Sequence, residues 1–525
     1  MAVNGGPGAA GAGPRRLGSR VVFVAANYRG EALGNHFAGV AVATTLHEQT
    51  ATFAAEGWSK VTRTPGLVLV DGPVGLPRAM TGIANAHASG SPLVAIDEPG
   101  ALDSPDMLDR HVAMASSITR AVLRVAPEDV SAVLPRAFAL ADLPPRGPVL
   151  VAVDARAGSQ GTGDPPGWAA SSDVAGLEPV LRLVHEAERP VIVAGGGVYW
   201  AGAEAALRRL AEARAVPVIM NGMGRGALPA DHALVVSRAR SVALREADLV
   251  LVAGTPLDFR LSYGQFGAAR LVHLCEDVSE VADHVELAGS VVGPLEEVLA
   301  ALAGGGSATP AALAWSGRLQ AEEVRRREEA AGQFDDDALP MRPTRCYGEL
   351  RRWLDRDAIV IGDGGDFVSY AGRFVDSFTP GSFLDPGPFG CLGVGTGYAL
   401  AAGLAQPGRQ VVALLGDGAA GFSLMEFETL VRYRLPVVAV VGNNGTWGLE
   451  KHHMRALFGY DVVADLDQGT RYDEVVRGLG GHGELVERPE DLPGALDRAA
   501  HAGVPALVNV LLDPADMYPR STMLA

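Results

Sequence analysis

Short apolar runs alternate with longer amphipathic stretches over almost the whole chain. Apolar runs lie at residues 21–25, 67–70, 93–96, 149–153, 190–194, 216–220, 249–253, 411–415 and 437–441. A run of this length followed by a helix-like stretch is typical of a βα unit, and repeated βα units form parallel sheets with helices on both faces. The pattern therefore predicts an α/β fold made of doubly wound parallel-sheet domains.

Two breaks in this alternation predict three domains. The segment 158–173 is rich in Gly, Pro and Ser, and the segment 304–340 contains a charged, helix-like stretch. We expect domains over residues 19–160, 174–305 and 341–525, with a linker over 306–340. Residues 1–18 are rich in Gly, Ala and Pro and have no apolar core, which predicts a disordered tail rather than a signal peptide.

Composition narrows the classes of partner. The 525-residue chain carries a formal net charge of −17, so no basic stripe is available for nucleic acid. No apolar run approaches the roughly 18 residues that a membrane-spanning helix needs. The three cysteines, Cys275, Cys346 and Cys391, are widely spaced and show neither a disulfide framework nor zinc-ligand spacing. We therefore expect a cytoplasmic protein that binds neither nucleic acid nor membrane.

The strongest chemical signal is a pair of polar turns in the last domain. Gly416-Asp417-Gly418 follows the run 411–415, and Asn443-Asn444 follows the run 437–441. Parallel strands end at the same edge of a sheet, so the two turns should meet there. The Asp417 carboxylate, the Asn444 amide oxygen and the Thr446 carbonyl would then form a Mg²⁺ site. An ordinary βαβ unit with glycine-rich turns is the alternative.

The two turns and their spacing resemble the cofactor-binding motif of thiamine-diphosphate (ThDP) enzymes. The resemblance implies ThDP and Mg²⁺ as cofactors, with the metal held by Asp417, Asn444 and the Thr446 carbonyl. It also places Gly416, Gly418 and Ala419 beside the diphosphate, where small residues let backbone N–H groups approach phosphate oxygens. The three predicted domains match the pyrimidine-binding, central and diphosphate-binding domains of that family.

A second constellation begins at Glu48, in the segment 47–58. An apolar stripe at helical spacing follows Glu48, which predicts a helix start at the carboxyl edge of the first sheet. Taken alone, Glu48 is equally a charge that complements the positive end of a helix. The segment resembles the helix that carries the ThDP family's activating glutamate. This implies that the Glu48 carboxyl group binds N1′ of the aminopyrimidine and so promotes loss of the C2 proton.

The resemblance also implies the oligomeric state and further cofactor contacts. In this family the glutamate and the metal site of one active site come from different subunits, so a homodimer or homotetramer is expected. Leu392 stands where the family places a bulky apolar residue that bends the cofactor, with Gly390 and Cys391 before it; a core leucine is the alternative. The loop 362–367, with Gly365, Asp366 and Phe367, matches another diphosphate-side loop, for which a plain turn is the alternative.

Several segments indicate the branch of the family. The segments 47–61, 389–404 and 443–452 look closest to acetolactate-synthase-like proteins, and 221–229 also resembles oxalyl-CoA decarboxylases and 2-hydroxyacyl-CoA lyases. At three positions, His453, Pro256 and Cys275, the chain has a different residue type from the one that the resemblance leads us to expect. The last two stand where relatives contact an adenine nucleotide, which leaves FAD or another adenine nucleotide doubtful as a ligand.

The pyrimidine-side loops depart further. Asn27 and Tyr28 replace a glycine-rich loop, and Arg78 replaces an asparagine. We interpret this as an altered substrate preference, with loss of activity as the alternative. Arg78 and Arg29 are candidates for binding an anionic substrate, because guanidinium groups suit planar oxyanions; surface arginines are the alternative.

The predicted function is decarboxylation of a small 2-keto acid followed by carboligation, as in acetolactate synthase. Two alternatives remain open. One is cleavage of a 2-hydroxyacyl- or oxalyl-CoA substrate, and the other is an inactive ThDP-binding or regulatory subunit.

Overall fold

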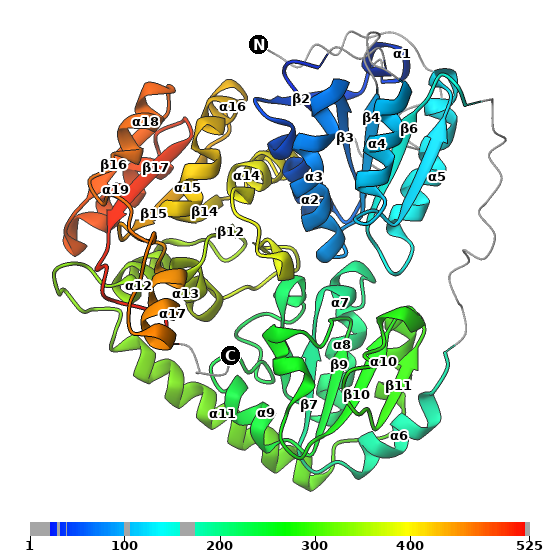
Figure 1. Cartoon of the computed structure of the whole chain (residues 1–525). Helices are drawn as coiled ribbons and strands as arrows, with labels where there is room; N and C mark the ends of the chain where they lie inside the picture. The colour runs from blue at the N-terminus through cyan, green and yellow to red at the C-terminus, as the bar shows by residue number, and fades with distance from the viewer. Residues whose placement is uncertain (1–20, 29–31, 38, 99–104, 158–173, 520–525) are drawn as a thin grey trace.

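The computed structural model describes residues 21–28, 32–37, 39–98, 105–157 and 174–519. Three parallel sheets flanked by helices follow one another along the chain (Figure 1). The predicted α/β class with three parallel-sheet domains is therefore confirmed. The expected tail over 1–18, the break at 158–173 and Arg29 lie outside the described residues.

The first sheet has the strand order β2-β1-β3-β4-β6-β5, which makes β2 an edge strand. Its strands are β1 (Val21–Ala25), β2 (Ala41–Thr45), β3 (Gly66–Asp71), β4 (Leu93–Glu98), β5 (Ala121–Val125) and β6 (Pro148–Val153). Its helices are α1 (Ala32–His36), α2 (Glu48–Thr62), α3 (Gly72–Ala88), α4 (Pro105–Ala115) and α5 (Val130–Asp142), with the short η2 (Pro127–Asp129).

The third sheet has the order β13-β12-β14-β15-β17-β16, which is the same topology as that of the first sheet. Its strands are β12 (Ile359–Asp363), β13 (Phe383–Leu384), β14 (Val411–Gly416), β15 (Val437–Asn443), β16 (His482–Val486) and β17 (Ala506–Leu511). Its helices are α12 (Pro343–Trp353), α13 (Asp366–Phe374), α14 (Val394–Ala405), α15 (Asp417–Ser423), α16 (Phe427–Arg432), α17 (Gly448–Phe458), α18 (Tyr472–Gly478) and α19 (Leu492–Ala500), with η6 (Gly387–Phe389), η7 (Leu424–Glu426) and η8 (Pro489–Asp491).

The central sheet has the order β11-β10-β9-β7-β8. Its strands are β7 (Pro190–Ala194), β8 (Val218–Met220), β9 (Leu249–Ala253), β10 (Arg270–Cys275) and β11 (Gly289–Val292). Its helices are α6 (Leu177–Glu186), α7 (Gly196–Trp200), α8 (Glu204–Arg214), α9 (Arg240–Glu246) and α10 (Leu295–Gly304), with η3 (Gly222–Gly224), η4 (Phe259–Gly264) and η5 (Val278–Glu280).

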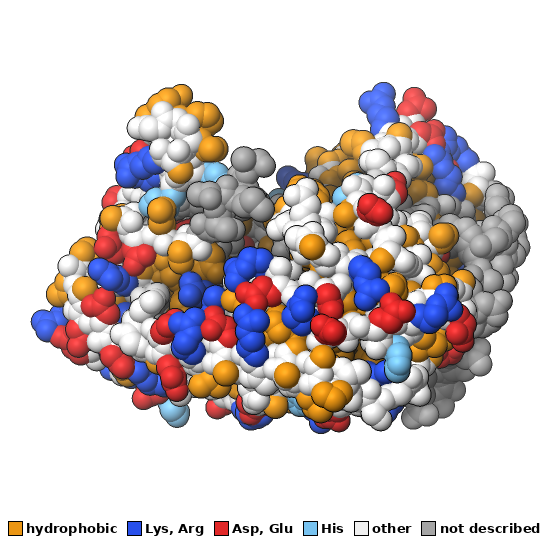
Figure 2. Space-filling model, turned by 90° about the horizontal axis from the view of Figure 1, so that it is seen from below, with side chains coloured by type: hydrophobic (Ala, Val, Ile, Leu, Met, Phe, Trp, Pro, Cys, Tyr) orange, Lys and Arg blue, Asp and Glu red, His pale blue; other side chains and the backbone are white. Residues whose placement is uncertain are grey.

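The linker expected over 306–340 contains the long helix α11 (Pro310–Ala331), which runs along the lower side of the molecule in Figure 1. Glutamates and arginines follow one another in short blocks on this helix and form ion pairs, as Arg325 does with Glu322. Figure 2 shows basic and acidic side chains intermingled on the face seen from below. Within the described part of the chain, no helix combines the length and apolarity needed to cross a membrane.

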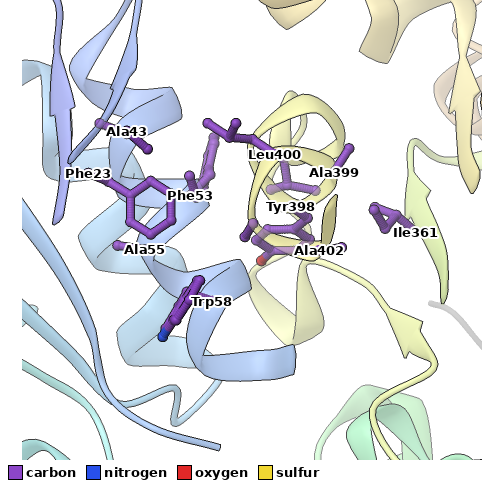
Figure 3. Packing of buried hydrophobic residues seen from close by; sticks show 14 of the residues in the cluster. Phe23, Ala43, Phe53, Ala55, Trp58, Ile361, Tyr398, Ala399, Leu400 and Ala402 are labelled. Atoms are coloured by element: carbon purple, nitrogen blue, oxygen red, sulfur yellow. The ribbon is translucent and has the colours of Figure 1, made fainter. Parts of the chain in front are cut away.

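The first and third sheets share one apolar core through α2 and α14 (Figure 3). The two helices approach closely because glycines face the partner helix. A Cβ atom on Gly57 would lie 2.9 Å from the Cα of Tyr398, and one on Gly397 would lie 2.7 Å from the Cβ of Phe53. Both helices are buried around most of their circumference, as expected for elements packed between two sheets.

A buried polar network ties the same two helices together. Glu56 and Lys60 form an ion pair of 3.0 Å, with side chains 0% and 1% exposed. The Tyr398 hydroxyl donates to Glu56 Oε2 at 2.8 Å, and Lys60 Nζ donates to the Asp385 carbonyl at 2.8 Å. Asn85 Nδ2 also donates to Glu56 Oε2, at 2.9 Å. Because each charge has several partners, these contacts offset the free-energy cost of removing it from water.

We predict that Gly397→Ala lowers the free energy of unfolding by about 1–3 kcal/mol, because the added methyl group overpacks the contact with Phe53. Gly317→Ala, in α11, is the matched control, since a Cβ there meets nothing within 4 Å. The control should be neutral or slightly stabilising, because alanine favours helix over glycine. Urea unfolding of both variants measures the difference, and equal effects would contradict the proposed packing role.

Candidate active site

Asp417 lies at the start of α15, directly after β14, and its side chain is buried. Its carboxylate faces the loop that follows β15. Oδ2 accepts a hydrogen bond of 2.7 Å from the Gly445 N–H, and Oδ1 accepts one of 2.9 Å from the Gly418 N–H. Burial raises the pKa of Asp417 to about 6, against the lowering effect of these N–H groups. The two predicted turns therefore meet at one sheet edge.

The two asparagines of the second turn occupy different environments. Asn443 is fully buried, and its Nδ2 donates to the Gln468 carbonyl and to Asn509 Oδ1 at 3.2 Å each. Asn444 is half-buried, and its Oδ1 accepts the Thr446 N–H at 3.2 Å. Asn443 thus holds the loop in place, whereas Asn444 lies in the loop beside Asp417, as the predicted ligand set requires.

The small residues after Asp417 have a packing role as well as the one expected from the sequence. A Cβ on Gly418 would lie 2.6 Å from the indole ring of Trp447, so only glycine allows this ring to pack there. Gly416 caps α15, and Ala419 is buried in its first turn. The first N–H groups of a helix have no partner inside the helix, which makes them available to an anion.

The segment that carries Gly390, Cys391 and Leu392 leads into α14 and is anchored by a buried carboxylate. Leu392 and Cys391 are half-buried and Gly390 is exposed, and Cys391 packs against the apolar core that the first and third sheets share. Burial raises the pKa of the Cys391 thiol to about 11. Asp363, at the end of β12, accepts the Gly393 N–H at 3.0 Å and the Gly395 N–H at 2.7 Å. Asp363 lies in the predicted loop 362–367, where no role of its own was assigned to it.

The other predicted diphosphate-side loop opens α13. Gly365 caps this helix, and Asp366 accepts the Tyr518 N–H at 3.2 Å. Phe367 is buried and packs against Tyr347, with ring centroids 5.1 Å apart. Its ring lies in the core of the third sheet, so a cofactor contact by Phe367 remains a prediction.

Glu48 is the first residue of α2, and His47 caps the helix by accepting the Gln49 N–H on Nδ1 at 3.0 Å. The Glu48 side chain is 4% exposed, and Oε1 lies 3.5 Å from Nη1 of Arg78, which is 46% exposed. Oε2 is buried and has no hydrogen-bond partner among the described residues. A buried acceptor without a partner costs free energy, so its persistence points to a ligand.

The pyrimidine-side loops bring further polar groups to this edge of the first sheet. Tyr28 donates from its hydroxyl to Glu98 Oε2, and Asn27 is exposed. His111 and Asp97, both buried, are joined at 2.8 Å at the end of β4. Among the described residues, two polar pairs therefore stand at the carboxyl ends of β1 and β4.

Pro256 and Cys275 both line a cavity of about 460 Å³ between the three domains. Several cations on its wall already have acidic partners: Arg260 pairs with Asp258 at 2.6 Å, and Arg146 pairs with Glu276. The prediction that FAD or another adenine nucleotide is a doubtful ligand stays a prediction. His453 lies elsewhere, half-buried on α17.

Three family models match the chain. Residues 16–101 match the N-terminal TPP binding domain of thiamine pyrophosphate enzymes, residues 177–302 the central domain, and residues 363–510 the C-terminal TPP binding domain. The chain belongs to the thiamine pyrophosphate enzyme family, and the prediction of a ThDP-dependent enzyme is confirmed.

Curated relatives refine this assignment. The chain is 47% identical over 504 residues to the acetolactate synthase large subunit IlvG of Mycobacterium tuberculosis, covering 93% of this chain and 91% of that protein. It is 29% identical to human 2-hydroxyacyl-CoA lyase 2, covering 92% and 86%, and 29% identical to oxalyl-CoA decarboxylase of Escherichia coli, covering 89% and 87%.

The residues fit the cofactor that this family implies. Glu48 Oε2 is a buried acceptor without a partner in the described chain, and Asp417, Asn444 and the Thr446 carbonyl supply the hard oxygen donors that Mg²⁺ prefers. Asp363 lies in the predicted loop 362–367 but had no role assigned to it, and Glu426 was not predicted. Both are carboxylates that accept backbone N–H groups from distant segments, and no local pattern shows which backbone groups they bind.

We predict that Asp363 lowers the free energy of unfolding as the pH rises. Burial raises its pKa to about 7 from a model-compound value of 3.8, so between these values the folded protein keeps a proton that the unfolded chain has lost. The stabilising contribution of Asp363 is therefore complete below about pH 4 and lost as pH rises to about 7. The difference in unfolding free energy between wild type and Asp363→Asn should shrink by a few kcal/mol over this range. Urea unfolding at several pH values measures it, and a constant difference contradicts the prediction.

Proposed function

We propose that the protein is a ThDP- and Mg²⁺-dependent enzyme that decarboxylates a small 2-keto acid and ligates the product to a carbonyl acceptor. The observation that carries this proposal is the combination of the Asp417–Gly445 contact, which closes a metal-ligand loop, with the unpartnered Oε2 of Glu48. The 47% identity to an acetolactate synthase large subunit favours carboligation over the CoA-thioester chemistry named for relatives at 29% identity.

Asp417, Asn444 and the Thr446 carbonyl would hold Mg²⁺, and the metal would hold the diphosphate against the start of α15. Leu392 would support the cofactor from the segment anchored by Asp363. Bound ThDP supplies a carbon nucleophile and an electron sink for cleavage of the bond next to a carbonyl group. The protein's part is to position these groups and to exclude water.

Glu48 would hold a proton at N1′ of the aminopyrimidine. Its near-complete burial strengthens a hydrogen bond to that nitrogen, because the local dielectric is low. Arg78 lies beside Glu48 and is half-exposed, so its remaining N–H groups face the solvent-accessible side. We propose that these groups bind the carboxylate of the donor 2-keto acid, since a guanidinium suits a planar oxyanion.

The functional unit would be at least a homodimer, and a homotetramer is compatible with the same contacts. Exposed apolar side chains lie within a few residues of the proposed site residues: Leu46 (47% exposed) near Glu48, Phe422 (60%) and Met425 (58%) after Asp417, and Phe389 (52%) before Leu392. Exposed apolar side chains that lie together mark interaction sites on proteins, and we propose that these four residues belong to one such site. A second copy would cover it and bring its own Asp417 loop to Glu48.

We predict that the protein, supplied with ThDP, Mg²⁺ and pyruvate, releases CO₂ and forms a ligated product. Glu48→Gln should keep ThDP affinity within threefold but lower turnover by about 100-fold or more, because the amide cannot hold the proton at N1′. Asp417→Ala should abolish Mg²⁺-dependent ThDP binding, measured by calorimetry. Product mass analysis with a panel of 2-keto acids and acceptors identifies donor and acceptor.

The outcomes separate the alternatives. Release of formyl-CoA from oxalyl-CoA, or of an aldehyde from a 2-hydroxyacyl-CoA, without turnover of any 2-keto acid would establish the thioester chemistry instead. ThDP binding without turnover of either substrate class would establish an inactive or regulatory subunit. Unchanged turnover in Glu48→Gln would contradict the proposed role of Glu48.

A mixing experiment tests whether the active site is shared between subunits. Glu48→Gln and Asp417→Ala homo-oligomers should each be inactive. When they are mixed and allowed to exchange subunits, a hybrid dimer combines the intact Glu48 of one chain with the intact Asp417 of the other. About one site in each hybrid should then be active. Mixing either variant with itself is the control, and the absence of recovery despite demonstrated subunit exchange contradicts a shared site.

A further inference from the structure

Glu426, on η7 of the third domain, reaches the turn that precedes Glu48 in the first domain. Its Oε1 accepts the N–H groups of Leu46 and His47 at 3.0 Å each. Its Oε2 accepts the Leu46 N–H at 3.1 Å and the Thr429 hydroxyl at 2.7 Å. The residue is 4% exposed, so these bonds are shielded from water.

Neighbouring residues hold the same turn. The Thr44 N–H donates to the Tyr433 hydroxyl at 2.7 Å, and Arg432 Nη2 donates to the Thr44 carbonyl at 3.1 Å. Strand β2 lies at the edge of the first sheet, so its outer backbone groups need partners from elsewhere. In Figure 1, α16 lies beside β2. The segment 426–433 therefore supplies partners for backbone groups of residues 44–47.

We propose that Glu426 is a positioning residue for Glu48. His47 caps α2 and Glu48 is the next residue, so the backbone that Glu426 holds determines where the Glu48 carboxylate points. Hydrogen bonds to a buried carboxylate are charge-assisted and therefore stronger than those to a neutral amide. A displacement of about 1 Å in a catalytic group can cost on the order of 100-fold in rate. This inference rests on the proposed function.

The test measures exchange of the ThDP C2 proton with solvent deuterium on the full-length protein saturated with ThDP and Mg²⁺. This rate reports cofactor activation directly and does not depend on the substrate. In Glu426→Gln we expect exchange to slow at least tenfold and kcat to fall by the same factor, while the Kd for ThDP changes less than threefold. In the Glu48→Gln background, Glu426→Gln should cause no further slowing, because Glu426 acts through Glu48.

Glu323 offers a matched control. It is also a buried glutamate that accepts backbone N–H groups from a distant segment, those of Ser237, Arg238 and Ala239 at 3.0, 2.7 and 2.8 Å. Glu323→Gln should lower the melting temperature but leave the exchange rate unchanged. Equal exchange in Glu426→Gln and wild type, or equal slowing in both glutamine variants, would overturn the proposal.

A second variant decides the case if Glu426→Gln does not fold. Tyr433→Phe removes only the hydroxyl that accepts the Thr44 N–H, and exchange should slow at least threefold; an unchanged rate would overturn the positioning role. A different result would contradict the proposed function itself. If Glu48→Gln itself leaves C2 exchange unchanged, Glu48 does not activate the cofactor, whatever the Glu426 variants do.

Discussion

The close contact of α2 with α14 is the constraint on which the rest of the structure depends. Gly57 and Gly397 bring the helices together, and the Glu56–Lys60 pair with Tyr398 fixes their register. Overpacking at this contact would cost about 1–3 kcal/mol and an unpaired buried charge about 3–5 kcal/mol, so the two helices have one compatible arrangement. Because α2 begins at Glu48 and α14 follows Leu392, this arrangement also fixes two of the proposed site segments relative to each other.

The alternation of apolar runs was sufficient to predict the fold class, because strands buried on both faces, such as β14 and β15, are continuously apolar. The helix start predicted at Glu48, at the carboxyl edge of the first sheet, follows strand β2, whose sequence Ala-Val-Ala-Thr-Thr is only partly buried at a sheet edge. Glu56 and Lys60 have the spacing of a solvated helix pair, yet both are buried. Their partner Tyr398 lies more than 300 residues further along the chain, beyond the reach of any local pattern.

The residues of the candidate site also fall into two groups, those that the sequence indicated and those that only the structure reveals. Asp417, Asn444 and Glu48 follow strands or begin helices at sheet edges, and position and residue type together marked them in the sequence. The role of Asp363 in the predicted loop 362–367 and the site role of Glu426 were not predicted, because each acts on the backbone of a distant segment. Glu428 stands two residues after Glu426 but is only half-buried and pairs with Arg432 at 3.1 Å, so composition alone does not distinguish the carboxylate that holds a distant backbone from the one in a local ion pair.

The attachment of the domains indicates where movement during a reaction is possible. The first and third sheets share a continuous apolar core, which leaves little freedom between Glu48 and the third sheet. The central domain meets the first through polar contacts: Arg63 pairs with Glu204 and lies over the ring of Tyr199, whose hydroxyl donates to the Lys60 carbonyl at 2.8 Å. Polar interfaces within a chain tolerate rearrangement better than apolar ones. We therefore expect adjustment to substrate in the position of the central domain, while the contact of α2 with α14 stays fixed.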